Sequence, residues 1–491
     1  MKNIKYIAIM ALGIISCEPE LDNSIEDSGF YSAGTADFSN FVSIGNSLTA
    51  GFADNALYTG GQKNSYPNIL ANKFSQVGGG TFTQPLVNDN LGGFTIGGAV
   101  ASDTRLVLTG TPLGLGNIAG TPTTEISNII AGPFNNIGVP GAKSFHLLSD
   151  SYGNISGLET GTANPYFVRM ASTPSATMLG DAVAQNPTFF SVWIGNNDIL
   201  GFATSGGVGI DQTGNLDPTT YSSTDITDPS VFLGTYDAIV TGLTANGAKG
   251  VVMNIPTVTS IPYFTTVPYN AIPMDAATAA GTNANPAIAS YNGGLLMAQG
   301  GMLIDAEEVA QRTISFNEGQ NALVIEDESL TDLSALGLPS IRQATNEDLI
   351  TLPTSSVIGT LADPSNPASV IGVAVPLNDS QVLTKNEVMM VSNAQNAYNN
   401  SISMLAAAND SVILVDVNAS LNQLANGGLT SNGVTITDEF ITGGGFSLDG
   451  VHPSARGYAF IANIIIEKIN SEFGATIPLT NTGNYPTTFI E

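Results

Sequence analysis

Histidine, cysteine and basic residues are scarce in this chain of 491 residues. With a single cysteine, Cys17, no disulfide can form within the chain. The two histidines, His146 and His452, cannot form an H-E-x-x-H zinc-protease signature and argue against a His/Cys metal site, so no metal is expected. Only 13 Lys and Arg residues stand against 41 Asp and Glu, and the formal net charge of −28 disfavours nucleic-acid binding through a basic surface.

Signals for cofactors and membrane spans are missing as well. No G-x-G-x-x-G, P-loop or S-x-x-K pattern occurs, so dinucleotide, ATP and Ser–Lys chemistry are not indicated, and no cofactor is expected. No segment beyond the N-terminus reaches about 18 uninterrupted apolar residues. The chain is instead rich in glycine (54) and proline (25), with 43% hydrophobic and 11% charged residues. This composition indicates a loop-rich globular protein rather than a helical bundle.

The N-terminus offers an explanation for the single cysteine. Lys2 and Lys5 precede a short apolar stretch at 7–15, and "IISC", which ends at Cys17, resembles the lipobox of bacterial lipoproteins. The resemblance implies that residues 1–16 are a signal peptide and that acylated Cys17 anchors the protein in outer-membrane lipid, on the cell surface or the periplasmic face. A plain secretory signal followed by an incidental cysteine is the alternative. Residues 17–37 are interpreted as a flexible tether. Its acidic start resembles the export tether of surface lipoproteins, and the alternative is a simple solvated linker.

Apolar patterning predicts alternating strands and helices. Strands are expected at 38–44, 186–194, 250–256 and 411–417, and helices at 65–74, 228–247, 386–408 and from 454 to about 469. Strand, helix, strand is the order typical of a parallel sheet covered by helices. Residues at about 75–130 and 262–384 lack this regularity, and we interpret them as insertions in one domain that spans 38–491.

A serine and a histidine carry the chemistry expected of the chain. Ser47 follows the first strand, where its hydroxyl would stand at the carboxyl edge of the sheet, the usual place for sites in open α/β folds. Asp449 precedes His452 by three residues, so on a tight turn its carboxylate can hold Nδ1–H and leave Nε2 as a base. Taken singly, Ser47 can be a helix cap and His452 a satisfied surface histidine.

Four short blocks place these residues in a common pattern. "GNSL" (45–48), "NIGVPG" (136–141), "GNND" (195–198) and "DGVHP" (449–453) occur in this order. Together they resemble the four sequence blocks of the SGNH, or GDSL-type, hydrolases, a family of serine esterases and lipases. The segment 247–262 also resembles the strand and loop that follow the third block. The resemblance covers roughly half of the chain and implies an α/β fold, a three-layer α/β/α sandwich with a mainly parallel, flavodoxin-like sheet and long insertions.

The resemblance also implies the roles of individual residues. Ser47 would be the nucleophile, His452 its base and Asp449 the group that orients the base, for hydrolysis of carboxylic esters without a cofactor. The implied oxyanion donors are the Ser47 N–H, the Gly141 N–H with Gly138 as the second choice, and the Asn197 side chain. Such donors stabilise a developing charge without reorganising. The substrate would be a lipid, a small acyl ester or an acylated glycan.

The chain departs from the family pattern in two places. Asn46 replaces the usual aspartate, which is harmless if that side chain serves as a hydrogen-bond acceptor and reduces activity if its charge matters. The gap from Asp198 to Asp449 is also far longer than a compact member needs, and we expect the extra residues to decorate the cleft or to form a lid. Two alternative functions stay open, a glycan O-acetylesterase and a non-catalytic surface binding lipoprotein.

Three other residues favour structural interpretations. His146, five residues after Gly141, is expected to be structural, and Trp193 is expected to pack in the core. Asp198 is expected to orient the third block rather than to join the reaction.

Overall fold

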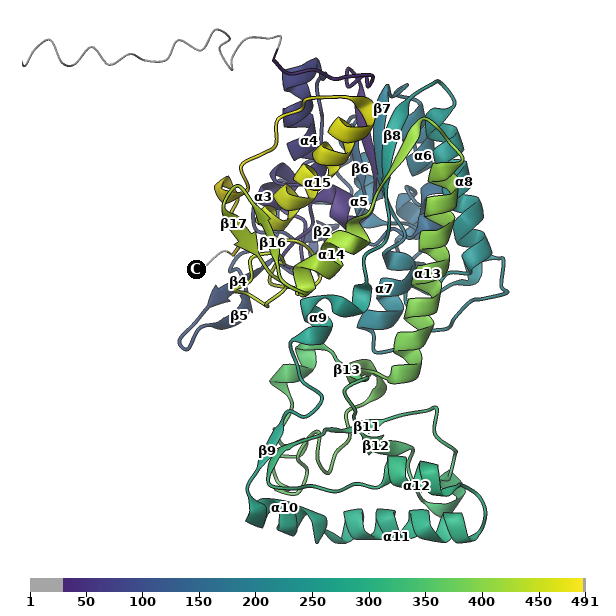
Figure 1. Cartoon of the computed structure of the whole chain (residues 1–491), viewed down its shortest axis with the longest axis vertical. Coiled ribbons are helices and arrows are strands. Elements are labelled where there is room, and N and C mark those ends of the chain that lie inside the picture. The colour runs from purple at the N-terminus through teal and green to yellow at the C-terminus, as the bar shows by residue number, and fades with distance from the viewer. Residues whose placement is uncertain (1–29, 489–491) are drawn as a thin grey trace, which may run out of the picture.

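The structure, a computed structural model, describes residues 30–488 (Figure 1). The predicted signal peptide, Cys17 and most of the predicted tether lie outside the described residues. The described end of the tether contacts the end of the last helix, α15 (Ala455–Phe473): the Thr35 N–H donates to Phe473 O, 2.8 Å away. The Ser32 N–H donates to Thr476 Oγ1 at 2.8 Å. Phe473 O is free to accept this bond because the last carbonyls of a helix have no partner within the helix. The two bonds show that the packed part of the chain begins before residue 38, inside the predicted tether.

The fold is α/β and is built on a five-stranded parallel sheet (Figure 1). The strand order is β15–β8–β7–β1–β6, and each neighbouring pair is parallel. The strands are β1 (Phe41–Gly45), β6 (Asn136–Gly138), β7 (Phe189–Trp193), β8 (Lys249–Met253) and β15 (Val412–Val415). In the sheet, β6 lies on one side of β1, and β7, β8 and β15 lie on the other side. The chain thus changes direction at β1, which opens a crevice at the carboxyl ends of β1 and β7.

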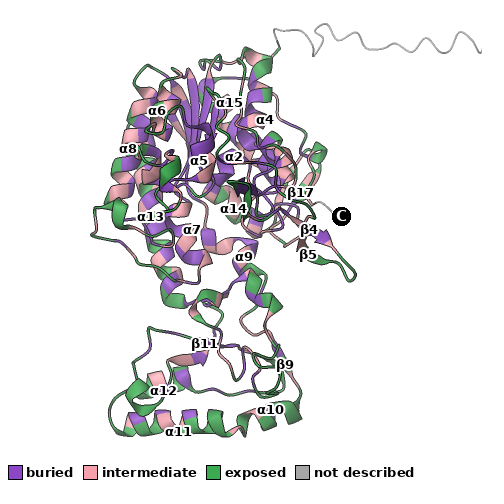
Figure 2. Ribbon diagram, turned by 180° about the vertical axis from the view of Figure 1, so that it is seen from behind, coloured by how far each residue is buried: buried purple, intermediate pink, exposed green. Residues whose placement is uncertain are grey.

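Side chains that alternate along the strands enter two hydrophobic clusters, one on each face of the sheet. Val42, Ile44 and Phe190 pack with one set of helices, and Phe41 and Phe189 pack with another. Figure 2 shows these central strands buried. The first set is α5 (Pro165–Met170), α6 (Met178–Val183), α7 (Asn197–Thr204), α8 (Pro229–Thr244) and α13 (Lys385–Ala407), and the second is α4 (Tyr66–Phe74) and α15.

The long elements confirm the predictions made from apolar periodicity. The strands β1, β7, β8 and β15 and the helices α4, α8, α13 and α15 lie within a few residues of the predicted ranges. The start of α8 follows the expected chemistry, because the Asp228 side chain accepts hydrogen bonds from the Ser230 and Val231 N–H groups and Pro229 occupies the first turn. Outside the central sheet, however, the six two-stranded sheets in residues 30–488 are all antiparallel.

Several short elements were not predicted. They include α5, α6, α7, β6, α2 (Ser47–Ala50), α3 (Thr59–Lys63), α14 (Val417–Ala425), β16 (Leu429–Ser431) and β17 (Val434–Ile436). The β16–β17 hairpin turns at Asn432 and Gly433, whose φ angles are 52° and 76°. An Asn-Gly pair between β-type residues is a strong hairpin signal, so this element could have been found in the sequence.

The two predicted insertions differ in size and form. The first holds the hairpins β2–β3 (Phe94–Ile96, Ala99–Ser102) and β4–β5 (Leu106–Thr109, Gly114–Asn117). The second forms the lower lobe of Figure 1, between β8 and α13, and has a hydrophobic cluster of its own. This lobe contains α9 (Pro262–Thr265), β9 (Ile272–Met274), α10 (Ala276–Asn283), α11 (Pro286–Gly300), α12 (Ala306–Arg312), β10 (Gly319–Asn321), β11 (Val324–Glu326), β12 (Ile341–Gln343), β13 (Leu349–Ile350) and β14 (Val382–Leu383). Within residues 30–488, no helix has the length and apolar character that crossing a bilayer requires.

Candidate active site

Ser47 is the first residue of the short helix α2, directly after β1. The cap of this helix is Asn46, whose Oδ1 accepts a hydrogen bond from the Leu48 N–H at 3.0 Å. Gly45 lets the helix begin this close to the sheet, because a Cβ there would lie 2.2 Å from Trp193 O. Ser47 is therefore held at the carboxyl end of β1, and its hydroxyl is not used as the helix cap.

The Ser47 hydroxyl lies at one end of a short chain of hydrogen bonds. Ser47 Oγ and His452 Nε2 are 2.9 Å apart, and His452 Nδ1 lies 2.9 Å from Asp449 Oδ2. The side chains of His452 and Asp449 are 13% and 8% exposed, so solvent reaches the imidazole while the carboxylate is nearly enclosed. Segments 405 residues apart in the chain thus place a hydroxyl, an imidazole and a carboxylate in one line.

The turn at 447–452 surrounds the Asp449 carboxylate with donors. Its Oδ1 accepts from the Ser447 hydroxyl and from the N–H groups of Val451 and His452, and its Oδ2 accepts from the Asn55 N–H. Burial alone would raise the pKa of Asp449. The charge of His452 and these hydrogen bonds outweigh burial and lower the pKa to about 2. Asp449 therefore remains ionised at neutral pH and holds the Nδ1–H of His452.

A second buried carboxylate, Asp54, supports this turn and was missed in the sequence. Asp54 Oδ1 accepts from the Leu448 N–H at 3.0 Å, and the Asp54 N–H donates to Ser447 Oγ at 3.0 Å. Its Oδ2 accepts from the Tyr58 hydroxyl at 2.7 Å. Asp54 and Asn55 both adopt left-handed backbone angles, with φ of 52° and 61°, which aspartate and asparagine tolerate best after glycine. The adjacent Asp-Asn pair soon after the "GNSL" block is the signal that could have indicated this turn.

The three candidate oxyanion donors come from the ends of β1, β6 and β7. Within the described residues, the backbone N–H groups of Ser47 and Gly141 have no hydrogen-bond acceptor. The Asn197 side chain donates through Nδ2 to Ala142 O at 2.9 Å, which joins the β7 end to the loop that carries Gly141. Gly141 is solvent-exposed with a φ of 82°. Gly138, the second choice, is unsuitable in this conformation because its N–H donates to Asn136 Oδ1.

Asp198 connects the same two loops from inside the protein. Its carboxylate is fully buried and accepts from the Ser144 N–H at 2.8 Å and the Ser144 hydroxyl at 2.6 Å. Burial raises the pKa of Asp198, and the bonds from Ser144 oppose this shift. Since Asp198 follows Asn197 and Ser144 follows the Gly141 loop, this pair fixes the spacing between two candidate donors.

His146 takes a structural position, away from Ser47. Its Nδ1 accepts from the Lys143 N–H at 3.0 Å, and its ring stacks on Tyr152 with centroids 4.3 Å apart. Burial, with the charge of Lys143, lowers the pKa of His146 to about 3. The imidazole is therefore neutral in the folded protein at every pH above that value.

The neutral state of His146 predicts a pH-dependent stability. The unfolded chain binds a proton at His146 below its ordinary pKa of 6.5, whereas the folded chain does so only near 3. The contribution of His146 to the free energy of unfolding is thus fully present above pH 6.5. It falls by about 1–2 kcal/mol between about pH 7 and about pH 5. Urea unfolding at both pH values should show a smaller loss for His146→Gln, which keeps an acceptor for the Lys143 N–H. Equal losses in the two proteins would contradict this assignment.

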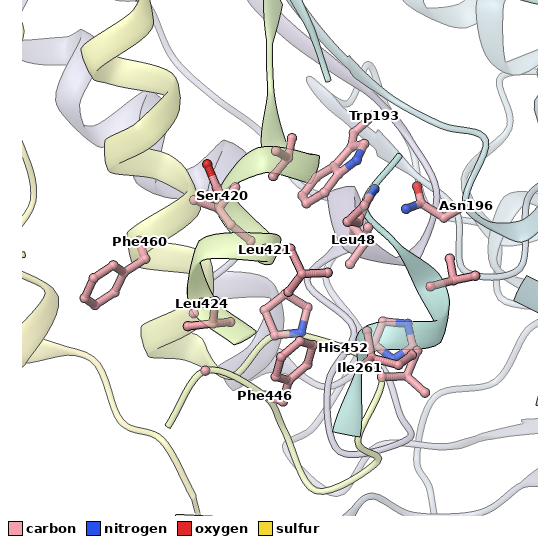
Figure 3. Close-up of a pocket in the computed structure, with 18 of the residues that line it drawn as sticks. Leu48, Trp193, Asn196, Ile261, Ser420, Leu421, Leu424, Phe446, His452 and Phe460 are labelled. Atoms are coloured by element: carbon pink, nitrogen blue, oxygen red, sulfur yellow. The ribbon is translucent and has the colours of Figure 1, made fainter. Parts of the chain in front are cut away.

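A pocket extends from Ser47 and His452 toward the C-terminal helices (Figure 3). Ser47, Asn196, Asn197 and His452 line it, and most of its other lining side chains are aliphatic or aromatic. Trp193 is 2% exposed and belongs to the core as predicted, and it also lines this pocket. Gly141 is not among the lining residues.

The base of the large lobe contacts the turn at 447–452. The Tyr263 N–H donates to Gly450 O at 2.9 Å, and the Tyr263 hydroxyl donates to Thr204 O at 3.0 Å. Ile261, just before α9, lines the pocket. The insertion therefore helps to hold the turn that carries Asp449 and His452.

Within residues 30–488, one group of carboxylates outside the candidate active site has ligand spacing for a cation. Ligand oxygens of Glu328, Asp379 and Glu387 lie within 4.8 Å of one another where the lobe meets α13. Burial, together with the other two carboxylates, raises the pKa of Glu387 to about 8, although bonds from Thr384 oppose the shift. The three groups are thus not all charged at neutral pH, as is common for clustered acids without an ion.

No protein-family model, curated protein or solved structure matches this chain.

Proposed function

We propose that the chain hydrolyses carboxylic esters with Ser47 as the nucleophile, as its resemblance to the SGNH hydrolases implies. The observation that carries the proposal is the line Ser47 Oγ–His452 Nε2 and His452 Nδ1–Asp449 Oδ2, with both hydrogen bonds at 2.9 Å. A nucleophile, a base and an orienting carboxylate in contact are the groups that acyl transfer by serine requires.

The sheet topology supports the same family. Numbered in chain order, the five central strands lie in the order 2-1-3-4-5, which is the flavodoxin-like order. Helices pack on both faces. We therefore propose a three-layer α/β/α sandwich of the flavodoxin-like SGNH type, with the catalytic residues in the crevice where the strand order reverses.

The reaction would proceed through an acyl-enzyme. Ser47 Oγ attacks the carbonyl carbon while its proton passes to His452 Nε2, and Asp449 holds the resulting imidazolium. The Ser47 and Gly141 N–H groups and Asn197 are the proposed donors to the oxyanion. The bond to the alcohol oxygen breaks as His452 returns the proton to that oxygen. Water, deprotonated by His452, then attacks the acyl carbon, and release of the acid restores the Ser47 hydroxyl.

The hydrogen bonds of Asn46, which stands where the family has aspartate, favour a role for this side chain as a hydrogen-bond acceptor. Its Oδ1 caps α2, and its Nδ2 donates to Asn196 Oδ1 at 3.3 Å. An aspartate at position 46 would keep the first bond and lose the second, because a carboxylate has no N–H to donate. We propose that Asn46 and Asn196 form a matched pair and that Asn46 does not disable the site.

Removing the Asn197 carboxamide tests the proposed oxyanion site. Asn197→Ala is expected to lower kcat for nitrophenyl acetate by about 10²–10³-fold, since one preorganised donor is lost. The rates of the wild-type and variant proteins, both lacking residues 1–17, are compared by nitrophenol release. Ser401→Ala, on α13 and outside the pocket lining, serves as a control.

Three results would contradict the proposal at different points. An unchanged kcat in Asn197→Ala would remove Asn197 from the oxyanion site. A wild-type protein without any esterase activity would favour the non-catalytic binding protein. Release of acetate from acetylated polysaccharide, but not from simple esters, would favour a glycan O-acetylesterase.

A further inference from the structure

The pocket beside Ser47 is polar at one end and apolar over the rest of its length. Figure 3 shows Asn196 and His452 on one side and Ser420, Leu424 and Phe460 on the other. Among the lining side chains far from the catalytic residues, Ser420 is the one with a hydroxyl, and it is 3.2 Å from Asp416 O, to which it donates. The far part of the pocket therefore presents no side-chain polar group that lacks a partner.

Three elements of the C-terminal part build the far wall. Leu421 and Leu424 project from α14, and Phe460, Ile461 and Ile464 from α15. The β16–β17 hairpin closes the wall with Leu429 and Ile436, which lie directly opposite each other in the strand register. Side chains paired in this way share one face of a hairpin, and this face is turned to the pocket.

We infer that this pocket binds the alkyl chain of a lipid ester whose carbonyl group reaches Ser47, an inference that rests on the proposed esterase function. An acetyl group would leave nearly the whole apolar wall without contact. A sugar would bring hydroxyl groups against Leu, Ile and Phe side chains that cannot replace their bonds to water, which is costly. An alkyl chain gains affinity from each methylene that it buries in such a pocket.

The inference predicts a strong preference for long chains. Each buried methylene is worth about a factor of four in binding, so kcat/KM for nitrophenyl octanoate should exceed that for the acetate by at least about 100-fold. The rates of hydrolysis of octyl acetate and ethyl acetate, measured by release of acid, are compared in the same way. This second comparison shows whether the bound alkyl chain belongs to the acyl part or to the alcohol part of the ester. A preference in either series supports the alkyl site, and a preference in neither overturns it.

A blocked pocket provides the matched variant. Leu421 is half-buried in the pocket wall, and Leu421→Trp should lower the ratio of octanoate to acetate kcat/KM by at least about tenfold. Because both rates come from one sample, this ratio does not depend on the folded fraction. Leu216→Trp, at a side chain 67% exposed and outside the pocket, should leave the ratio unchanged. An unchanged ratio in Leu421→Trp would overturn the inference.

Trp193, the single tryptophan of the chain, gives a readout that needs no catalysis. In Ser47→Ala, 2-bromododecanoic acid, whose bromine lies next to the carboxyl end, should quench its fluorescence on contact, and dodecanoic acid should relieve the quenching. Quenching without ester hydrolysis by the wild type would keep the alkyl site and reject the proposed function. Ester hydrolysis with acetate preferred and no quenching would keep the function and reject the alkyl site.

Discussion

Ser47→Ala is expected to lower kcat for ester hydrolysis by about 10⁴–10⁶-fold, because the variant lacks the group that forms the acyl-enzyme. Any residual rate would come from substrate binding and from the oxyanion donors. The comparison is made with nitrophenyl esters that the wild type hydrolyses, under identical conditions.

Ser47→Ala should remove the nucleophile without disturbing the fold. The cap of α2 is the Asn46 side chain, so the helix keeps its N-terminal bond in the variant. The recorded side-chain bond of Ser47 within residues 30–488 is the one to His452 Nε2. The thermal unfolding midpoint should therefore change little while activity is lost. Ser401→Ala, on α13, is the control. A Ser47→Ala rate within about tenfold of the wild type would contradict nucleophilic catalysis by this residue.

Asp449→Asn is expected to lower kcat by about 10⁴-fold although the side-chain shape is kept. An asparagine that offers its N–H₂ to His452 Nδ1 favours the tautomer with the proton on Nε2, which cannot accept the Ser47 proton. Both Asp449 oxygens accept backbone N–H groups, so either orientation of the amide places N–H₂ against a donor. The unfolding free energy should therefore also fall, by about 1–3 kcal/mol.

The pH dependence of stability separates these two effects of Asp449→Asn. The pKa of Asp449 is lowered from 3.8 to about 2, so its ionised form stabilises the folded state above 3.8, and this contribution disappears as the pH falls toward 2. The stability curves of wild type and variant should therefore converge over this interval. Parallel curves, or a kcat within about tenfold of the wild type, would contradict the role given to Asp449.

The central sheet and the residues of the candidate site could be predicted because their signals are local. The strands β1, β7 and β8 are short apolar runs buried on both faces of the sheet, and such continuous runs are easily recognised in a sequence. Ser47 and the Asp449–His452 pair were found because each block keeps its spacing within five residues. That these blocks meet, over 405 positions, is a property of the sheet order and could only be expected from the resemblance.

The pocket wall and the support of the catalytic turn could not be predicted in the same way. The helix α14 begins immediately after β15, so the apolar pattern of the strand runs into that of the helix and hides the boundary. The Asn432–Gly433 hairpin could have been predicted from its Asn-Gly pair, but the sequence does not show that Leu429 and Ile436 line the pocket. Asp54 acts through Leu448 and Ser447, which are 394 and 393 residues away. No pattern of spacing reports such a contact.

Covalent labelling with a fluorophosphonate tests the central claim most directly, because this reagent reacts with a serine only when a base activates it in an oxyanion site. We expect a single adduct, found by peptide mass spectrometry on Ser47, absent in Ser47→Ala and formed far more slowly in Asp449→Asn. An unlabelled Ser47 in folded wild-type protein that hydrolyses esters, or an adduct on another serine, would contradict it.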